Sequence, residues 1–247
     1  MDEPESGGLD GGRTRARRGL APTRLGGAQG DQLVGAEAAP APSCLGHARG
    51  ARGVQKKLEQ AVAEERAKHP DKPVEVWATD EHRIGLKPIL RRVWAPKGQR
   101  PIALGHHRSK WLYVTAFIQP TSGETFWSIS NGVSKPFFAA LLALFAREAG
   151  AGRERIIVPG LDSAGWHSAP NLVVPEGLRL VYLPPYSPEL QPAEHLWPVV
   201  DEPLANQYFE TLADLERAVA DRCRVLDGDQ LSLGTNFHWW PKPIMPA

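Results

Sequence analysis

The sequence predicts a mixed α/β fold, and three observations lead to this prediction. Short runs rich in β-branched residues indicate strands, and longer runs with apolar residues on one helical face indicate helices. From residue 54 onward the order is a helix, three strands, a helix, two strands and further helices. Two of the strands end at an aspartate, and open sheets carry their chemistry at such strand ends. The order of elements alone indicates no particular α/β fold.

The first predicted elements are one helix and three strands. Apolar residues share one helical face over Val54–Lys68, and Pro70 follows the end of this helix. Val74–Asp80 alternates between apolar and polar residues, which predicts a strand that ends at the first aspartate. Two further strands are predicted over Trp111–Ile118 and Glu124–Ser130, and the turn-forming sequence QPTSG joins them.

The second half of the chain continues with helices and strands. Ser134 is the predicted N-cap of a helix, and we expect its apolar stripe to belong to the core: Phe137, Leu141, Leu144 and Phe145. A strand then ends at Asp162, and another is predicted over Leu178–Leu183. Thr211 is predicted to cap the last helix, whose apolar face comprises Leu212, Leu215, Val219, Cys223 and Leu226.

Residues 1–53 differ in composition from the rest of the chain. They are rich in Gly, Ala, Arg and Pro, and they contain no Phe, Tyr, Trp, Ile or Lys. Such a segment buries too little apolar surface to offset its ordering entropy, so we predict that 1–53 is disordered and that 54–247 forms the folded domain. The alternative is a basic arm for DNA, with acidic residues interspersed, that uses Arg13, Arg15, Arg17 and Arg18.

Composition limits the classes of protein to which the chain can belong. The 247 residues have a formal net charge of +1, so any surface for nucleic acid must be local. Cys44 and Cys223 are too few for a disulfide framework. The acidic N-terminus does not resemble a signal peptide, and the longest apolar run, around Phe137–Ala146, is too short to span a bilayer. These features predict a soluble intracellular protein.

Three carboxylates on separate elements are the candidate functional residues. Asp80 and Asp162 each end a predicted strand, and Glu194 begins a helix after the proline-rich turn Pro184–Pro188. Proline fixes φ, so this turn is stiff and holds Glu194 at a defined position. Three converging carboxylates repel one another unless a cation neutralises them, and oxygen ligands suit Mg²⁺ or Mn²⁺. The sequence therefore predicts a shared metal site.

The sequence around these acids resembles that of a known family. Asp80 in WATDEHRIGL, Asp162 in LDSAGWHSA and Glu194 in LPPYSPELQPAEHLW resemble the catalytic motifs of mariner-like DDE transposases encoded by bacterial insertion sequences. The 31 residues between Asp162 and Glu194 are similar to the compact spacing of that group, and the resemblance covers roughly Val54–Pro241. It implies a ribonuclease-H-like mixed sheet flanked by helices.

The resemblance also implies an activity and a set of partners. Asp80, Asp162 and Glu194 would hold two Mg²⁺ or Mn²⁺ ions, one activating water or a DNA 3′-hydroxyl and the other stabilising the leaving oxygen. The expected partners are DNA, at element ends and target, and a second copy of the chain. The expected location is the bacterial cytoplasm, with the nucleoid. Because residues 1–53 lack a helix-turn-helix pattern, we expect a truncated or frame-shifted product whose helix-turn-helix is supplied by another polypeptide or by a fused reading frame.

A basic band follows the first acid. Between His82 and Lys110 there are no acids and eight basic residues: Arg83, Lys87, Arg91, Arg92, Lys97, Arg100, Arg108 and Lys110. Two short strands, around Arg91–Trp94 and Pro101–Leu104, predict a hairpin-like insertion. We expect Arg83, Lys87, Arg91, Arg92, Lys97 and Arg100 to bind DNA phosphates, and a solvated loop is the alternative.

Other interpretations of the same residues stay open. His167 lies near the substrate phosphate, and so binds DNA, or it caps the turn after Asp162. Ser163 and His167 could instead form a hydrolase pair, although the G-x-S-x-G motif is absent. Glu81 should point to the strand face opposite Asp80. The last alternative to a transposase is an inactive remnant that binds DNA without catalysis.

Overall fold

The computed structural model describes residues 44–97, 102, 104–105, 108–168 and 171–246. The prediction of disorder for residues 1–43, and the arginines of the proposed basic arm, lie outside the described residues. Helix α1 spans Cys44–Lys68 and so begins before Val54, the predicted start of this helix. Glycine lowers helix propensity, which hid the first turns of α1 from the sequence analysis. Packing against the core offsets this low propensity. Ala51 lies against the core, and Gly50 lies so near Leu190 that an added Cβ would be 3.2 Å from Leu190 Cδ1.

Five strands form one mixed sheet in the order β3-β2-β1-β4-β5. The neighbours β1, β2 and β3 are antiparallel, whereas β4 runs parallel to both β1 and β5. The strands are β1 (Val74–Gly85), β2 (Trp111–Gln119), β3 (Glu124–Ser130), β4 (Ile156–Leu161) and β5 (Val181–Tyr182). The predicted α/β class is confirmed. The predicted strand over Leu178–Leu183 is shorter in the structure, where Leu178 forms only an isolated bridge with Ile157.

The central strand β1 is longer than the predicted Val74–Asp80. Its pairing with β4 ends at Ala78 opposite Gly160, and its pairing with β2 continues to Gly85 opposite Trp111. Asp80 therefore lies inside β1, just beyond the point where β4 leaves it. The next three residues, Glu81, His82 and Arg83, are polar, so the sequence pattern did not show that β1 continues and pairs with β2 there.

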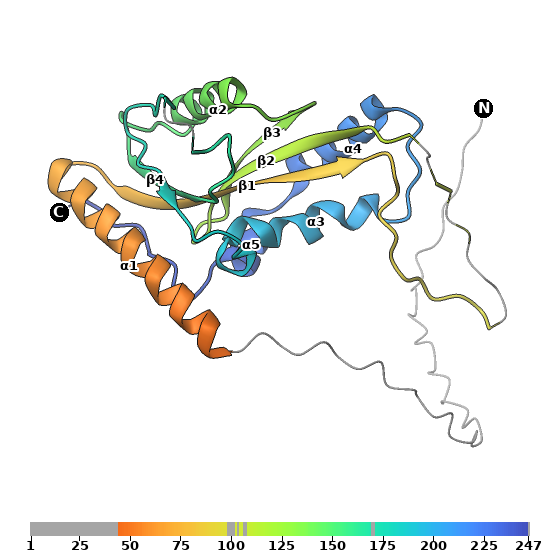
Figure 1. Ribbon diagram of the computed structural model, residues 1–247, viewed down its shortest axis with the longest axis horizontal. Helices are drawn as coiled ribbons and strands as arrows, with labels where there is room; N and C mark the ends of the chain where they lie inside the picture. The colour runs from red at the N-terminus through yellow and green to blue at the C-terminus, as the bar shows by residue number, and fades with distance from the viewer. Residues whose placement is uncertain (1–43, 98–101, 103, 106–107, 169–170, 247) are drawn as a thin grey trace, which may run out of the picture. The chain divides into compact units, whose positions relative to one another are not determined.

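Helix α2 (Lys135–Glu148) covers one face of the sheet (Figure 1). The predicted N-cap is confirmed, because the Ser134 side chain accepts a hydrogen bond from Phe137 N. The buried face differs from the predicted stripe: Leu144 is 38% exposed, and Phe138 and Leu142 are buried. The aromatic residues of the sheet decide this phase, since the Phe145 ring stacks on Phe117 with centroids 4.0 Å apart.

The helices α1, α3 (Trp197–Asp201), α4 (Leu212–Val225) and α5 (Gly228–Thr235) pack against the other face, where they share one core cluster with β1 and β2. Figure 1 shows α1 and α2 on opposite sides of the sheet. Thr211 caps α4 as predicted, in a capping box with Asp214. The short helix α5 was not among the predicted elements. Trp240 in the tail is buried and packs against Gly160.

Two further features bear on function. The predicted strand over Arg91–Trp94 is wrong, because these residues have no regular secondary structure. Of the second predicted strand, Pro101 and residue 103 lie outside the described residues. Within the described ranges, no helix combines the length and the apolar character that crossing a membrane requires.

Candidate active site

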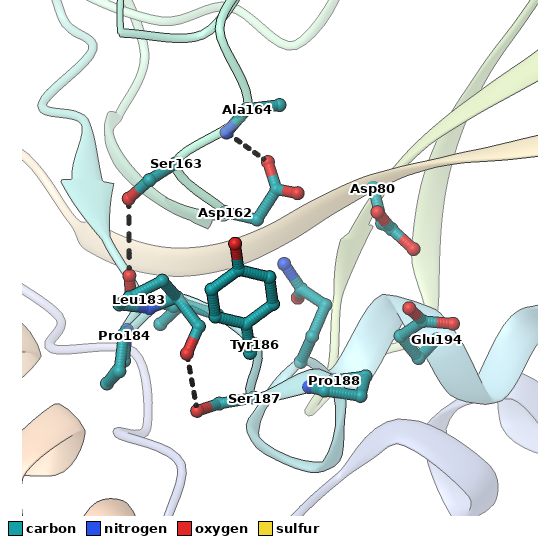
Figure 2. A pocket seen from close by; sticks show the side chains of 12 residues that line it. Asp80, Asp162, Ser163, Ala164, Leu183, Pro184, Tyr186, Ser187, Pro188 and Glu194 are labelled. Atoms are coloured by element: carbon teal, nitrogen blue, oxygen red, sulfur yellow. Dashed lines mark hydrogen bonds between the residues drawn. The ribbon is translucent and has the colours of Figure 1, made fainter.

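The three predicted carboxylates line one cavity of about 400 Å³ (Figure 2). Asp80 comes from β1, Asp162 is the first residue after β4, and Glu194 lies in the 3₁₀ helix η2 (Pro192–Leu196). The remaining wall consists mainly of the segment from Leu183 to Pro188. The fold therefore brings together the three acids that the sequence analysis selected, from three different elements.

Gln191 fixes the entry to η2, and the sequence analysis did not assign it a role. Its side chain is buried, and Nε2 donates hydrogen bonds to the carbonyl oxygens of Thr79 at 2.9 Å and Gly160 at 3.4 Å. These carbonyls belong to β1 and β4 near the point where the two strands separate. Gln191 thus ties the segment that carries Glu194 to the strands that carry the two aspartates. A glutamine directly before a proline was the only signal of this role in the sequence.

The proline-rich segment holds an unusual backbone conformation. Leu183 N donates to Leu161 O at 2.8 Å, which anchors the start of the segment to β4. Tyr186 has φ 55°, in the left-handed region, and its side chain is fully exposed. The 3₁₀ helix η1 (Pro188–Leu190) follows, and Leu190 is buried against the core. Rigid prolines and the buried Leu190 set the path of this wall, as predicted from the fixed φ of proline.

Asp80 carries an excess of negative charge in its surroundings. Burial raises the pKa of its carboxyl to about 7, and the negative charge of Glu194 contributes to this rise. Trp197 Nε1 donates a hydrogen bond to Asp80 Oδ2 at 2.8 Å, which partly opposes the rise in pKa. The Trp197 ring in turn stacks on His82, with centroids 5.0 Å apart. A cation at this position would relieve the repulsion between Asp80 and Glu194.

Asp162 has different surroundings, because its carboxylate binds His167. Nδ1 of His167 lies 2.6 Å from Asp162 Oδ1, and Nε2 lies 2.9 Å from Glu81 Oε1. The His167 hydrogen bond lowers the pKa of Asp162. Although burial opposes it, hydrogen bonding to the two carboxylates raises the pKa of His167 to about 9, so the imidazole is protonated at neutral pH.

The structure gives His167 a different place from the predicted DNA contact. The side chain is fully buried, and both ring nitrogens bind carboxylates. The suggested Ser163–His167 pair is also wrong, because the Ser163 hydroxyl points to Leu183 O at 3.5 Å. As the strand alternation predicts, Glu81 lies on the face of β1 opposite Asp80, where His167 packs against Phe138 of α2.

The donor set at the cavity has the chemistry of a divalent metal site. Three carboxylates with oxygen donors suit Mg²⁺ or Mn²⁺, and the raised pKa of Asp80 marks a place that lacks positive charge. Within the part of the chain that the structure describes, no three side chains of metal-binding type are close enough to hold an ion together. Asp80 and Glu194 interact electrostatically, whereas Asp162 is held by His167.

Of the predicted DNA-binding arginines and lysines that the structure describes, Arg83 lies in β1 and the others lie on the segment after β1. Arg83, Lys87, Arg91, Arg92 and Lys97 are exposed, and Arg100 lies outside the described residues. The Arg83 guanidinium lies over the Trp111 ring, 5.1 Å from its centroid. Arg91 Nη2 donates to Pro198 O at 3.2 Å, which places Arg91 against the start of α3, four residues after Glu194.

Comparison with known proteins identifies the family. The model of the DDE superfamily endonucleases matches residues 75–216, more than half of the chain and all three acids of the cavity. The chain belongs to the DDE superfamily endonucleases. A relative from Sinorhizobium fredii (strain NBRC 101917 / NGR234), Uncharacterized protein y4pE/y4sA, is 32% identical over 106 residues, which are 42% of this chain and 77% of that protein.

Solved structures of the Mos1 transposase share the fold of this DDE endonuclease. The Mos1 mariner paired end complex with Mn aligns with a TM-score of 0.55 at 17% identity, and the Mos1 Strand Transfer Complex with 0.52 at 16%. Both alignments cover 83% of this chain and 62% of the Mos1 chain, so the chain spans less than two thirds of the Mos1 length. The predicted ribonuclease-H-like fold and the predicted family are therefore confirmed.

Proposed function

We propose that this DDE endonuclease cleaves DNA strands at the ends of an insertion sequence and joins them to target DNA. Asp80, Asp162 and Glu194 are the catalytic residues of the proposal. One observation carries it: carboxylates from β1, from the end of β4 and from η2 line a single cavity. This donor set would hold two Mg²⁺ or Mn²⁺ ions, which supply an activated water or 3′-hydroxyl and stabilise the leaving oxygen.

The protein's own residues hold the site ready for this chemistry. Trp197 donates to Asp80 and keeps one of its oxygens in place, while Gln191 holds the Glu194 segment against β1 and β4. Asp80 and Glu194 repel each other in the absence of a cation. Pairing their charges would stabilise the protein, so folding and ion binding are coupled at this site.

The names of the Mos1 structures support the choice of partners. One is a paired-end complex with the left transposon end, and others contain Mn or Mg. We infer by analogy that this chain binds element ends and target DNA, and that it does so as a dimer. We expect sequence-specific end recognition to depend on a helix-turn-helix domain, on this or another polypeptide.

The exposed basic residues offer a path for DNA next to the cavity. Arg91 contacts the start of α3 through Pro198, and Asn206 binds the backbone of Arg91 at both N and O, so the segment is tied to the site. We propose that Arg83, Lys87, Arg91, Arg92, Lys97 and Arg100 neutralise DNA phosphates there. Contacts of this kind are independent of sequence and weaken with salt.

Plasmid nicking tests the proposed activity without knowledge of the element ends. The purified chain should convert supercoiled plasmid to nicked circles with Mn²⁺ or Mg²⁺, and chelation should stop the reaction. It should also join a labelled oligonucleotide 3′-hydroxyl to plasmid. Asp80→Asn, Asp162→Asn and Glu194→Gln should each lower the rate by at least about 10³-fold, since each removes a charge that the transition state needs.

Glu189→Gln is the matched control for these variants. Glu189 is an exposed acid five residues before Glu194 that does not line the cavity, so its rate should equal that of the unchanged chain. Full activity of any one cavity variant would remove that residue from the site. A folded chain that binds plasmid and never nicks it would instead show the inactive, DNA-binding remnant.

A further inference from the structure

A row of three ionisable side chains, two of them buried, leads from behind β1 to the cavity. It begins at Glu81 on β1, passes through His167 and ends at Asp162, with separations of 2.9 Å and 2.6 Å. Asp162 is 52% exposed and lines the cavity, whereas the side chains of Glu81 and His167 are 6% and 0% exposed. The row therefore links the rear face of the strand that carries Asp80 to a cavity carboxylate.

Several contacts fix His167 in this position. Its backbone N donates to Ala164 O at 2.9 Å, and Tyr182 Oη of β5 donates to His167 O at 2.8 Å. The ring packs against Phe138 of α2, with centroids 4.3 Å apart. His167 is thus held by α2, by β5 and by the turn after β4, so it is a firm point from which to orient Asp162.

Stability alone is a weak reason for this arrangement. The surrounding core cluster is aromatic and aliphatic, with Trp77 and Phe117 from the sheet. Replacing a buried ion pair by apolar residues of similar size is often neutral or stabilising. The polar layer also contains unsatisfied groups, because Thr79 Oγ1, Thr115 Oγ1 and Trp166 Nε1 lack a hydrogen-bond partner among the described residues. Thr115 lies opposite Glu81 in the β1–β2 register.

The two hydrogen bonds to the Asp162 carboxylate go to the same oxygen. His167 Nδ1 and Ala164 N both bind Oδ1, at 2.6 Å and 3.1 Å. This arrangement fixes the rotation of the carboxylate and leaves Oδ2 for a further ligand. Figure 2 shows the Ala164 contact and the position of Asp162 across the cavity from Asp80 and Glu194.

We propose that His167 is the positioning residue for Asp162, anchored on Glu81, and that it presents Oδ2 of Asp162 to the divalent cation of the cavity. This inference rests on the proposed function for the identity of the cavity's ligand. It assigns His167 and Glu81 to the reaction through Asp162, although neither side chain reaches the cavity itself. Mutation of a residue that hydrogen-bonds to a metal ligand typically lowers metal affinity or activity by about 10–100-fold.

Three substitutions of His167 separate positioning from packing. His167→Asn keeps a donor near the place of Nδ1 and can still bind Asp162, but it loses Glu81. His167→Gln keeps a donor near the place of Nε2 and can still bind Glu81, but it loses Asp162. His167→Phe retains the ring volume and loses both hydrogen bonds. Ser168→Ala, at an exposed neighbour in the same turn, is the matched control.

The first measurement is Mn²⁺ binding without DNA, followed by electron paramagnetic resonance. We expect the Mn²⁺ dissociation constant to rise about 10–100-fold in His167→Phe and His167→Gln, and by less than about fivefold in His167→Asn. Ser168→Ala should bind as the unchanged chain does. The nicking rates should follow the same order, with the loss in kcat rather than in the KM for DNA.

The inference has clear contrary results. If folded His167→Phe binds Mn²⁺ as tightly as the unchanged chain does, the proposal is overturned. If His167→Phe does not fold, equal Mn²⁺ affinities of His167→Asn and His167→Gln would overturn it instead. An unchanged chain that binds Mn²⁺ no better than Asp162→Asn would also overturn it. Failure of the proposed function gives a different result. The Mn²⁺ affinities of the His167 variants would then follow the expected order, but the unchanged chain would not nick plasmid.

Discussion

Asp80 and Glu81 are neighbours in β1, and their carboxylates have opposite electrostatic surroundings. Asp80 lies on the cavity side, where burial and Glu194 raise its pKa to about 7 and the side chain that donates to it, Trp197, is neutral. Glu81 lies on the side of α2, where its side chain is 6% exposed and binds the protonated ring of His167. One peptide bond therefore separates an uncompensated carboxylate from a compensated one.

The difference shows how the fold distributes charge around the cavity. On the α2 side, the protonated ring of His167 binds both Glu81 and Asp162, which holds these carboxylates in place. On the cavity side the repulsion between Asp80 and Glu194 remains in the folded protein. Unrelieved repulsion of this kind is typical of functional sites, because a ligand of opposite charge relieves it. The contrast makes separate predictions for the two faces.

The largest expected effect is on the cavity side, in the metal-free protein. The pKa of Asp80 is higher in the folded chain, at about 7, than its ordinary value of 3.8, so folding takes up a proton between these values. Stability should therefore fall as pH rises from about 4 to 7 and then level off, by about 4 kcal/mol at most. Asp80→Asn does not titrate at this position, so it should keep its stability as pH rises and be more stable than the unchanged chain at pH 8. Urea unfolding measures both free energies.

Divalent ions sharpen this first prediction. Mn²⁺ should stabilise the unchanged chain at pH 8 and should have a much smaller effect on Asp80→Asn. Similar stability of the two chains near pH 3.5 serves as the internal control, since Asp80 is then protonated when folded and mostly protonated when unfolded. A difference that stays constant from pH 3.5 to pH 8 would show that Asp80 carries no uncompensated charge.

The next effect is on the α2 side, where removal of Glu81 leaves a buried hydrogen-bond donor without its partner. Glu81→Leu should destabilise the chain by about 1–3 kcal/mol, because Nε2 of the buried His167 loses its hydrogen bond while Nδ1 keeps Asp162. The double variant Glu81→Leu/His167→Phe should return to within about 1 kcal/mol of the unchanged chain, since Asp162 is half exposed. Urea unfolding measures both variants, and additive losses in the double variant would refute the pairing.

The smallest expected effect is on DNA binding by the exposed basic segment. This binding should not depend on Asp80 or on Glu81. Neutralising Arg91, Arg92 and Lys97 to glutamine should reduce the slope of log affinity against log salt by about 0.9 for each phosphate that the protein no longer neutralises. The Mn²⁺ affinity should stay unchanged. Lys56→Gln/Lys57→Gln on the exposed face of α1 is the control, and an equal change in slope there would make the segment a solvated loop.

Several features of the site followed from the sequence. Asp80, Asp162 and Glu194 could be chosen because each ends or begins an element that the sequence predicts, and local patterns of apolar residues and prolines can be recognised without a structure. Ser134 and Thr211 could be assigned as caps for the same reason, because capping depends on residues three positions apart. Family membership followed from the motifs around the three acids.

Other features depended on contacts between distant segments. Ala51, before the predicted helix start, packs against the core, and β1 continues past Asp80 because β2 pairs with it. Nothing near His167 in the sequence shows that its ring is buried or that Glu81, 86 positions earlier, binds it. Gln191 likewise acts on carbonyls of two strands.

The division has a physical reason. Secondary structure and caps reflect interactions over a few residues, so the sequence by itself determined most of the helices and strands, the two caps and the choice of the three acids. Burial, pKa and hydrogen-bond partners depend on what lies across the sheet, so only the tertiary structure decided that Asp80 stays uncompensated and that His167 faces Asp162 rather than DNA.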